Sequence, residues 1–336
     1  MRDPYIQPSE RTIPDLYREL FVINGLAETI SIINPETREI YPDALPTGMW
    51  PNHLLYYNDR IYIVNSGDNE IEIYDESSFE KIGEIYLGAG SNPWMIIHPE
   101  ESQKGYVPNF AAGDVAVIDL EDFSIDLRIP VGKGPEGGVY QDGKIYVCNT
   151  AWDYQLFDFD EGTVSVIDVS ADEVISTLSV GKNPQSAISF PDIEEIHVIC
   201  TGKNGGFGSD DGEIYIISTP DDTVDQQVLS IGGSPSWTGN SFDRNNNTVY
   251  LTGVGGLMSY NYQTREILHG SDDYILSGPD AESDFYSGVA VDELNGTIYS
   301  CFYSRDEIVV LSLQSYDILE TIEGSDGVQS IYLFEE

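Results

Sequence analysis

A repeated segment of aromatic, aliphatic and polar residues is the feature that most constrains how this chain can fold. It occurs seven times, as FVIN, YIVN, YVPN, YVCN, HVIC, VYLTG and IYSCF. The spacings between the ring-bearing residues of successive copies are 41, 44, 40, 51, 53 and 49 residues, measured through Phe21, Tyr62, Tyr106, Tyr146, His197, Tyr250 and Tyr299. A period of this length indicates a repeat architecture.

Each copy is followed by a segment in which apolar and polar residues alternate, such as EIEIYD at 70–75. Alternation with a period of two predicts β-strands, and no stretch shows the 3.6-residue period of an amphipathic helix. A third strand follows, then a glycine-containing turn, then a fourth short strand such as SAISFP at 186–191. Small residues in these fourth strands, among them Gly137 and Gly288, fit a crowded innermost position. Seven such units predict an all-β fold, a seven-bladed β-propeller of four-stranded antiparallel blades.

The two ends of the repeat pattern predict how the ring closes. The pattern begins with three strands of a blade, at about residues 19–45, and ends with a single strand at 329–334. We expect this C-terminal strand to join the N-terminal blade, because that removes the exposed edge of an open array. Residues 1–15 contain three prolines and no repeat pattern, so we interpret them as a tail or linker. Residues 16–336 are expected to form one propeller domain.

The chain is strongly acidic, with 58 aspartates and glutamates against 15 lysines and arginines and a net charge of −43. Nucleic acids and anionic membrane surfaces are recognised by clustered basic residues, so we expect neither as a partner. The acidity fits either a solvated surface suited to saline surroundings or attraction of a cationic partner. No run reaches the roughly 18 to 20 apolar residues of a membrane span. We therefore expect no membrane insertion, and we expect a monomer.

Recognisable catalytic and metal-binding patterns are sparse. The cysteines are odd in number and lack C-x-x-C spacing, so neither a disulfide framework nor a zinc site is indicated for Cys148, Cys200 and Cys301. No H-x-x-x-H pattern, nucleophile elbow, P-loop or dinucleotide fingerprint is present. The sequence therefore favours a protein that is not an enzyme and predicts no cofactor. The catalytic alternative is a carbohydrate lyase or hydrolase that combines His53, Glu136 and a tyrosine such as Tyr286 across blades.

Alternating strand direction places two sets of loops on one face, which we call the upper face. They are the turns before the fourth strands and the segments after each YV-x-N copy. All four tryptophans are expected there, as are the three largest insertions, at 151–162, 202–212 and 269–284. Loops on a rigid scaffold concentrate binding residues, and large aromatic side chains dominate binding hot spots. The alternative is that each tryptophan only fills a gap between blades. The opposite face carries short turns that we interpret as ordinary hairpin connections, such as 243–248 and 293–297.

Side chains directly after the turn prolines are expected to face the mouth of the central channel. These positions hold Asn52, Trp94, Glu136, Gln185 and Ser236, and Ser287 and Gln329 align with them less closely because no proline precedes either one. A ring of amides, one carboxylate and aromatic groups suits a polar, partly apolar ligand. The alternative is that the ring holds ordered water in the channel.

Charged residues of the upper loops leave two further interpretations open. Lys182, with Lys133 and Lys203, would receive an anionic ligand group, although Gly-Lys-x is also a common turn sequence. The acidic side chains of the insertions are ligand types that Ca²⁺ prefers. They are Asp153, Asp158, Asp160, Glu161, Asp210 and Asp211. Because no EF-hand or nonapeptide pattern accompanies them, solvated charge is the simpler interpretation.

Several motifs carry a family resemblance. The YV-x-N segments, the strands VAVIDL and VSVIDV, and the turns VGKGP and VGKNP resemble the YVTN family of bacterial and archaeal β-propeller repeats, over about residues 16–336. The order of YVCNTAWDY, TGKNGGFGSDDG and GGSPSW is similar to surface lipoprotein propellers of Bacteroidetes, one group of which captures cobalamin. The resemblance implies an extracytoplasmic protein with a ligand on its loop face. The N-terminus has no apolar signal segment, so we expect the leader to be absent from this chain.

The sequence therefore favours a non-catalytic binding propeller that captures a small ligand or a protein partner through aromatic and acidic loops at the channel mouth. The candidate ligand-binding residues are Trp50, Asn52, His53, Trp94, Glu136, Trp152, Tyr154, Lys182, Gln185, Phe207, Trp237, Tyr286 and Gln329. The alternatives are an acidic scaffold or redox-complex subunit that docks a basic partner, and the carbohydrate-active enzyme described above.

Overall fold

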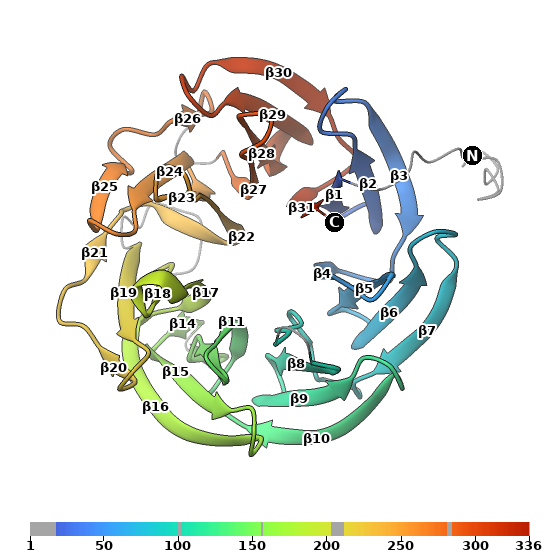
Figure 1. Ribbon diagram of the computed structural model, residues 1–336, viewed down its shortest axis with the longest axis vertical. Coiled ribbons are helices and arrows are strands. Elements are labelled where there is room, and N and C mark those ends of the chain that lie inside the picture. The colour runs from blue at the N-terminus through green and yellow to red at the C-terminus, as the bar shows by residue number, and fades with distance from the viewer. Residues whose placement is uncertain (1–17, 100–101, 156, 203–211, 281–283, 336) are drawn as a thin grey trace.

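The computed structural model describes residues 18–99, 102–155, 157–202, 212–280 and 284–335. These residues form seven antiparallel sheets arranged like the blades of a fan around one axis (Figure 1). The predicted seven-bladed β-propeller is therefore confirmed. Residues 1–15, interpreted as a tail, lie outside the described residues. Within the described ranges, no helix is long and apolar enough to cross a membrane.

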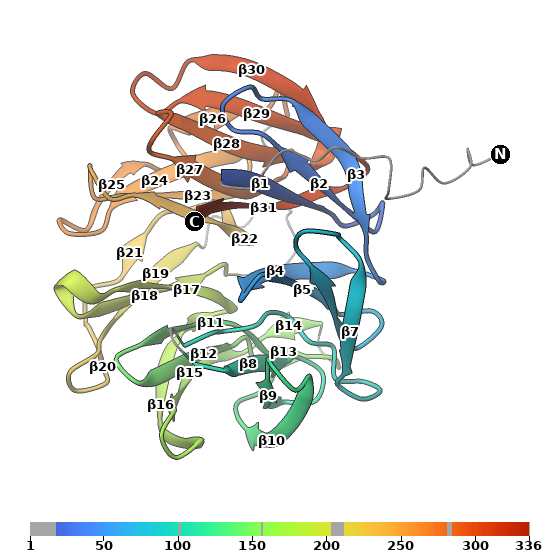
Figure 2. The ribbon, with the colours of Figure 1, turned by 45° about the vertical axis from the view of Figure 1, so that its right-hand side comes forward.

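Each blade runs from an inner strand beside the axis to an outer strand at the rim, as the turned view also shows (Figure 2). Blade 1 consists of β31 (Val328–Glu335), β1 (Arg18–Asn24), β2 (Thr29–Ile33) and β3 (Ile40–Pro46). Blade 2 consists of β4 (Pro51–Tyr57), β5 (Arg60–Asn65), β6 (Glu70–Asp75) and β7 (Lys81–Tyr86). Blade 3 contains β8 (Lys104–Asn109), β9 (Asp114–Asp119) and β10 (Ser124–Pro130). Blade 4 consists of β11 (Pro135–Gln141), β12 (Lys144–Asn149), β15 (Glu161–Asp168) and β16 (Glu173–Lys182).

The outer strands of blades 5 and 6 are each split in two. Blade 5 consists of β17 (Pro184–Phe190), β18 (Glu195–Cys200), β19 (Glu213–Ser218), β20 (Thr223–Val224) and β21 (Leu229–Ser230). Blade 6 consists of β22 (Ser234–Asp243), β23 (Thr248–Val254), β24 (Gly256–Asn261), β25 (Glu266–His269) and β26 (Leu276–Ser277). Blade 7 consists of β27 (Tyr286–Asp292), β28 (Thr297–Phe302), β29 (Glu307–Ser312) and β30 (Ile318–Glu323). A separate hairpin, β13 (Trp152–Asp153) with β14 (Asp158–Phe159), forms part of the insertion of blade 4.

The inner segment of blade 3 differs from the prediction of a regular strand. It pairs with β8 only through two isolated bridges, Pro93 with Asn109 and Ile97 with Tyr106. Pro108 lies opposite this segment and has no backbone N–H to donate. Its carbonyl accepts from the N–H of Trp94 at 3.0 Å, but the return bond of the pair cannot form. The ladder is therefore interrupted beside Trp94.

The ring closes as the sequence predicts. Strand β31 pairs with β1 along its length, so the C-terminal strand becomes the inner strand of the N-terminal blade. Blades 7 and 1 are joined further by the Tyr299 hydroxyl, which donates to the carbonyl of Pro35 at 3.2 Å. A buried ion pair between Arg18 and Asp292 spans the same junction. Closure therefore combines a strand ladder with side-chain contacts.

The repeated asparagine holds neighbouring strands together inside a blade. Asn149 Nδ2 donates to Thr163 Oγ1 at 3.1 Å and to Ser165 Oγ at 3.0 Å, both on β15. Equivalent bonds to the next strand are made by Asn24, Asn65 and Asn109. All four side chains are buried. The most recognisable residue of the repeat is therefore structural.

The repeated tyrosine connects one blade to the next. Tyr146 donates to Asp222 of blade 5 at 2.6 Å, and Lys144 pairs with the same carboxylate at 2.7 Å. Tyr106 makes the corresponding bond to Asp172 of blade 4 at 2.5 Å. Hydrophobic clusters fill the space between the sheets, so that residues of adjacent blades pack in one core. The tyrosine rings pack at the edge of these cores, and their hydroxyls form the hydrogen bonds that buried polar groups need.

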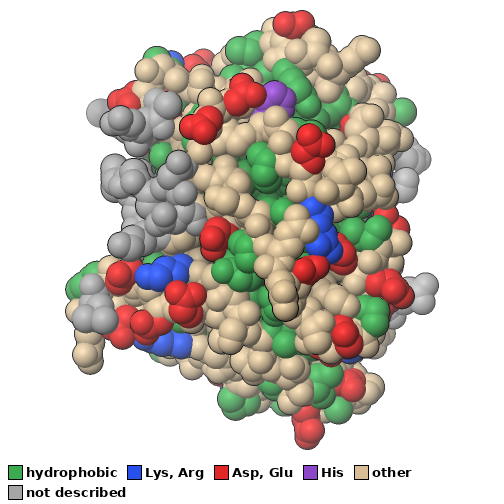
Figure 3. Space-filling model, turned by 90° about the vertical axis from the view of Figure 1, so that its left-hand side faces the viewer, with side chains coloured by type: hydrophobic (Ala, Val, Ile, Leu, Met, Phe, Trp, Pro, Cys, Tyr) green, Lys and Arg blue, Asp and Glu red, His purple; other side chains and the backbone are tan. Residues whose placement is uncertain are grey.

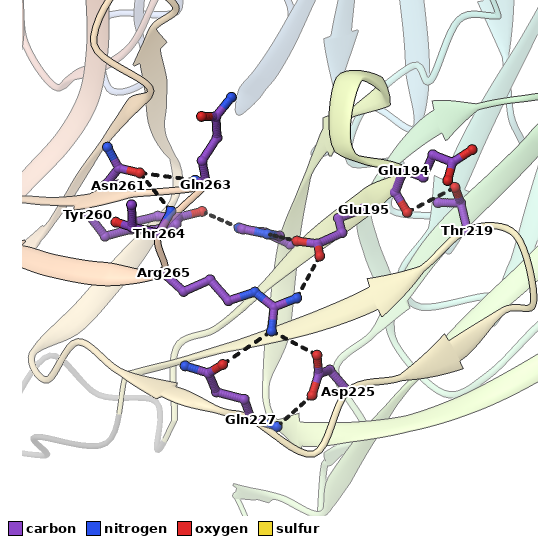
Figure 4. A network of polar contacts seen from close by, with 11 residues as sticks. Glu194, Glu195, Thr219, Asp225, Gln227, Tyr260, Asn261, Gln263, Thr264 and Arg265 are labelled. Atoms are coloured by element: carbon purple, nitrogen blue, oxygen red, sulfur yellow. Dashed lines mark hydrogen bonds and ion pairs between the residues drawn. The ribbon is translucent and has the colours of Figure 1, made fainter.

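A different network joins blades 5 and 6 (Figure 4). His197 Nε2 lies 3.1 Å from Glu195 Oε2, and Nδ1 lies 2.9 Å from the Tyr260 hydroxyl. Arg265 pairs with Glu195 at 2.5 Å and with Asp225 at 2.8 Å. Burial lowers the pKa of His197, so its ring is neutral at neutral pH. The neutral ring donates to the carboxylate and accepts from the tyrosine.

The cysteines are all unpaired and buried, at Cys148, Cys200 and Cys301. Desolvation raises the pKa of each thiol well above its usual range. Because the thiolate is the reactive form, these cysteines act as small packing residues.

Candidate functional site

Two sets of loops share the upper face, as the strand directions predict. The N–H of Thr150, after β12, donates to the carbonyl of Gly134, before β11, at 2.9 Å. Thr201 makes the corresponding bond to Asn183 in blade 5, at 3.0 Å. These bonds hold each turn before an inner strand against the loop between the next two strands.

Inner strands bulge where they begin at the upper face. The pairing register shifts directly after Pro51 and Pro184, and comparable shifts occur in blades 1, 4, 6 and 7. A β-bulge leaves one residue out of the ladder and redirects its side chain. Gln185 illustrates the effect, because its amide reaches across to Glu136 of blade 4 at 2.9 Å. Gln329 likewise donates to the carbonyl of Pro51 in blade 2, at 3.3 Å.

The upper mouth of the channel contains a cavity of about 170 Å³. Inner segments of six blades line it, and the side chains that do so include Asn52, His53, Trp94, Met95, Gln185, Ser186, Thr238, Asn240 and Tyr332. Four of these, Asn52, His53, Trp94 and Gln185, were predicted as ligand-binding residues. The inner strands approach so closely that a Cβ atom at Gly137 would lie 2.1 Å from the carbonyl oxygen of Gln185. Because glycine has no Cβ atom, it allows the two inner strands to approach this closely.

Two buried polar atoms of this cavity have no hydrogen-bond partner among the described residues. They are the amide nitrogen of Asn52 and the hydroxyl of Ser186. A buried polar group without a partner costs about 1–3 kcal/mol of folding free energy. Such groups in a cavity indicate a place for water or for polar atoms of a ligand.

Burial disfavours the charged form of both His53 and Glu136 at the upper mouth. Burial lowers the pKa of His53 to about 4, and its Nδ1 accepts from the N–H of Ile96 at 3.4 Å. Glu136 is 2% exposed, and this burial raises the pKa of its carboxyl well above the usual range, although the bond from Gln185 works in the opposite direction. Among the described residues, no side chain that lines this cavity is charged at neutral pH, although the protein has a net charge of −43.

An aromatic strip leads from the cavity across the upper face. It consists, in order, of Trp94, Phe110, Tyr154, Trp152 and Phe157. The ring centroids of neighbours along this order lie 5.8, 6.5, 6.2 and 6.1 Å apart. Tyr154 is 59% exposed and Phe157 is 78% exposed. Contiguous exposed apolar surface on a folded protein often marks a site of ligand or partner binding. Phe110 was not among the predicted binding residues, although it directly follows YVPN, at the position that defines the upper loops.

The remaining predicted residues are placed in different ways. Trp50 lies on the upper face and is 58% exposed, but it does not line the cavity. Lys182 lines a separate cavity at the rim, beside Glu161 and Glu213. Phe207 lies outside the described residues, and Trp237 lies on β22 with a side chain that is likewise outside the description.

Tyr286 is buried, contrary to its predicted role at the channel mouth. It is 1% exposed and stacks on Phe302 within blade 7, with ring centroids 4.3 Å apart. The reason is register, because Tyr286 pairs directly with Phe302 before the bulge, whereas the residue that follows it is displaced. The suggested catalytic group of His53, Glu136 and Tyr286 is therefore not assembled at the mouth.

Among the described residues, no three histidine, cysteine or acidic side chains lie together as metal ligands. Within the insertion of blade 4, Asp153 pairs with Lys133 at 3.3 Å, and Asp158 accepts from a neighbouring backbone N–H. Asp210 and Asp211 lie outside the described residues.

These observations define the class of protein: a seven-bladed β-propeller with a neutral, partly aromatic cavity at one mouth of its channel. No family model matches the sequence, and no curated protein matches it. The likeness to the YVTN family and to Bacteroidetes lipoproteins therefore stays a resemblance.

Solved structures share the fold at low sequence identity. Hydrazine synthase from Kuenenia stuttgartiensis aligns with a TM-score of 0.65 and 14% identity, over 83% of this chain and 88% of that chain. The dihydro-heme d1 dehydrogenase NirN in complex with DHE aligns with a TM-score of 0.63 and 12% identity, over 96% and 76%. A functionally unknown protein from Desulfotomaculum acetoxidans DSM 771 aligns with a TM-score of 0.70 and 14% identity, over 94% and 99%. At these identities the likeness extends to the fold alone.

Proposed function

We propose that this protein is a non-catalytic binding propeller that captures a small ligand at its upper mouth. The observation that carries the proposal is a buried cavity with unpartnered polar atoms that opens onto a continuous aromatic strip. The polar end of the ligand enters the cavity and meets the Asn52 amide. Its flatter, less polar body lies on the strip beyond Trp94.

The lining residues limit the chemistry of the ligand. The cavity offers amides, hydroxyls and a neutral imidazole, and none of the described side chains that line it is charged at neutral pH. The acidic exterior repels anions. A neutral or cationic ligand with carbonyl, amide or hydroxyl groups is therefore favoured. At about 170 Å³ the cavity is smaller than the roughly 300–1,000 Å³ of typical small-molecule sites, so it takes one end of the ligand only.

Cobalamin is the first probe to test. It is a large, partly flat molecule with an edge of amide groups, and the Bacteroidetes resemblance points to it independently. NirN, which shares the fold, is itself known in complex with DHE. By the same resemblance we propose that the protein works outside the cytoplasm.

Thermal unfolding with cyanocobalamin, and with maltohexaose as a neutral oligosaccharide, tests the proposal. A ligand present at 100 times its Kd stabilises the folded state by about 2.7 kcal/mol, which raises the melting temperature measurably. We expect this rise to disappear in Trp94→Ala and Asn52→Leu. Trp50→Ala is the matched control, because Trp50 is exposed on the same face away from the cavity. Stabilisation that persists in Trp94→Ala would place the ligand elsewhere.

A second candidate function is an acidic scaffold or redox-complex subunit that docks a basic partner. Many basic side chains are already paired with carboxylates of this chain, as in Lys104 with Asp172 and Lys144 with Asp222. Acidic side chains consequently dominate the charged surface, as the view of the rim near blades 5 and 6 illustrates (Figure 3). Binding of a lysine-rich peptide should weaken steeply as salt rises from low ionic strength to about 0.5 M, where the Debye length falls well below 10 Å. Binding that is insensitive to salt would contradict this function.

A further inference from the structure

The lower mouth of the channel contains a second, larger cavity. Its volume is about 510 Å³, within the range of roughly 300–1,000 Å³ typical of small-molecule sites. Three adjacent blades line it, through residues 240–242 of β22 and Arg244 after it, 289–291 and Glu293 of blade 7, and 331–334 of β31. Asn240 and Tyr332 line both cavities, so these two side chains lie where the upper and lower cavities meet.

The lower cavity combines apolar walls with charged residues, whereas no charged residue is among the described lining of the upper one. Aromatic and aliphatic residues of all three blades line it, namely Phe242, Val289, Val291, Ile331, Leu333 and Phe334, of which Val289, Val291 and Ile331 are buried. Phe242, Leu333 and Phe334 are only half-buried. A ligand that covers such side chains gains about 25 cal/mol for each Å² of apolar surface removed from water. The walls therefore favour a ligand with an aromatic or branched aliphatic group.

Arg244 supplies a positive charge at the edge of this cavity. Its guanidinium carbon lies 4.4 Å from the centroid of the Phe242 ring, which fixes the guanidinium over an aromatic wall. No carboxylate of the described residues pairs with it, whereas nine other described lysines and arginines form ion pairs. Arg244 shares this lack of an ion pair with Lys182 and Arg305 among the described basic residues, but it alone of the three lines the lower cavity, where its planar fork suits a ligand carboxylate.

Glu293 supplies a negative charge to the same cavity. Its Oε1 accepts from the N–H of Arg244 at 2.6 Å, and its Oε2 accepts from the side-chain amide of Asn245 at 3.0 Å. Both donors are neutral, so they position the carboxylate without cancelling its charge. Each oxygen keeps a lone pair for a further donor. No ion pair between Glu293 and the Arg244 guanidinium is formed within the described residues, so both charges are left to a ligand.

We propose that the lower mouth binds a zwitterion with an apolar side chain, namely an apolar amino acid or a dipeptide built from such residues. The ligand carboxylate bonds to the Arg244 guanidinium, its ammonium group faces Glu293, and its side chain packs against Phe242 and Leu333. A zwitterion has no net charge, so the field of the acidic protein does not oppose its entry. This site uses the opposite end of the channel from the upper mouth and does not depend on the function proposed there.

Calorimetric titration with three related dipeptides tests each charge separately. The probes are leucyl-phenylalanine, its N-acetyl form, which lacks the ammonium group, and its C-terminal amide, which lacks the carboxylate. We expect leucyl-phenylalanine to bind and each blocked form to bind at least ten-fold more weakly. Equal affinity for all three, or no binding at about 10 mM, ten times a Kd of 1 mM, would overturn the proposal.

Variants assign each ligand group to its residue. Arg244→Gln should weaken leucyl-phenylalanine at least ten-fold and leave the affinity for the C-terminal amide unchanged. Glu293→Gln keeps an acceptor for the N–H of Arg244, and it should weaken leucyl-phenylalanine without affecting the N-acetyl form. Such selective losses are the signature of a pairwise interaction.

Arg305→Gln is the matched control, because Arg305 also lies over a phenylalanine ring, at 5.0 Å, but does not line the cavity. An equal loss in this variant would mean that only the overall charge matters, which would overturn the site. Trp94→Ala at the upper mouth should bind leucyl-phenylalanine as the unmodified protein does. Retained melting temperatures establish that each variant is folded.

Discussion

The junction between blades 4 and 5 and the upper mouth of the channel both contain buried polar groups. These groups are paired at the junction, whereas two of them have no partner at the mouth. At the junction of blades 4 and 5, the hydroxyl of Tyr146 and the ammonium of Lys144 share the carboxylate of Asp222. At the upper mouth, the Asn52 amide and the Ser186 hydroxyl are buried with no partner among the described residues. This junction therefore pairs its polar groups, whereas the Asn52 amide nitrogen and the Ser186 hydroxyl at the mouth are left available at a cost in stability.

The difference follows from the position of each residue along its strand. Tyr146 and Lys144 lie within a regular antiparallel ladder, so their side chains reach the turn of the next blade that holds Asp222 in a fixed register. Mouth residues follow the turn at the start of an inner strand, where the ladder bulges. A bulge directs side chains toward neighbouring inner strands and the channel. Residues at the bulges could therefore be exchanged to alter the ligand, while the residues of the ladders keep the core unchanged.

Asp222→Ala should produce the largest loss of stability and so tests the role of the junctions. The change leaves the buried Tyr146 hydroxyl unpaired and removes the partner of Lys144, so we expect unfolding to become easier by about 2–3 kcal/mol. Chemical denaturation monitored by circular dichroism measures this. Asp221→Ala is the control, because the neighbouring Asp221 bonds only locally, to exposed Thr223. If both variants lose equally little, the junction bonds are not what stabilises the ring.

The propeller itself could be predicted because its signals are local. The alternation within segments such as 70–75 reflects a single strand, and the spacing of the repeated tyrosines reflects the length of chain that builds one blade. Ring closure by residues 329–334 also followed, because the pattern begins with three strands of a blade and ends with the single strand that completes it. The exception was the inner segment of blade 3, where Pro108 interrupts the pairing and a strand pattern gave only bridges.

The sites could be predicted only in part, because they depend on how separate blades meet. Asn52 and Gln185 were identified from their place after a proline, and they do line one cavity. Tyr286 had no proline before it to fix the alignment, and it proved to be a core residue. Arg244 and Glu293 belong to short turns that have the sequence of ordinary hairpin connections. Nothing in either turn indicates that the two meet across a cavity.

Both His53 at the mouth and His197 at the junction should make the stability of the protein depend on pH. Both rings are held neutral by burial, with pKa values below the usual 6.5, and that of His53 is about 4. A histidine with a lowered pKa binds fewer protons when folded than when unfolded, so each contributes a loss of stability as pH falls below about 6.5. We expect the drop in melting temperature between pH 7 and pH 5 to shrink in His53→Asn and in His197→Gln.

The two histidine variants should differ at neutral pH. His197→Gln disturbs the bonds to Tyr260 and Glu195 and should lower stability by about 1 kcal/mol at pH 7. His53→Asn should change stability little at pH 7, because His53 accepts only one long bond from Ile96. A loss at pH 7 that is equal in both variants would erase the distinction between mouth and junction.

Asn52→Leu should have the smallest effect on stability and so tests the comparison most sharply. Leucine is close to asparagine in size and removes an amide nitrogen that is buried without a partner. Removing such a group relieves a desolvation cost, so we expect stability to stay within about 0.5 kcal/mol of the unmodified protein or to rise. Ligand capture at the upper mouth should be lost in the same variant. If Asn52→Leu instead destabilises the protein as much as Asp222→Ala does, the Asn52 amide is a structural contact and the mouth is built on the same principle as the junctions.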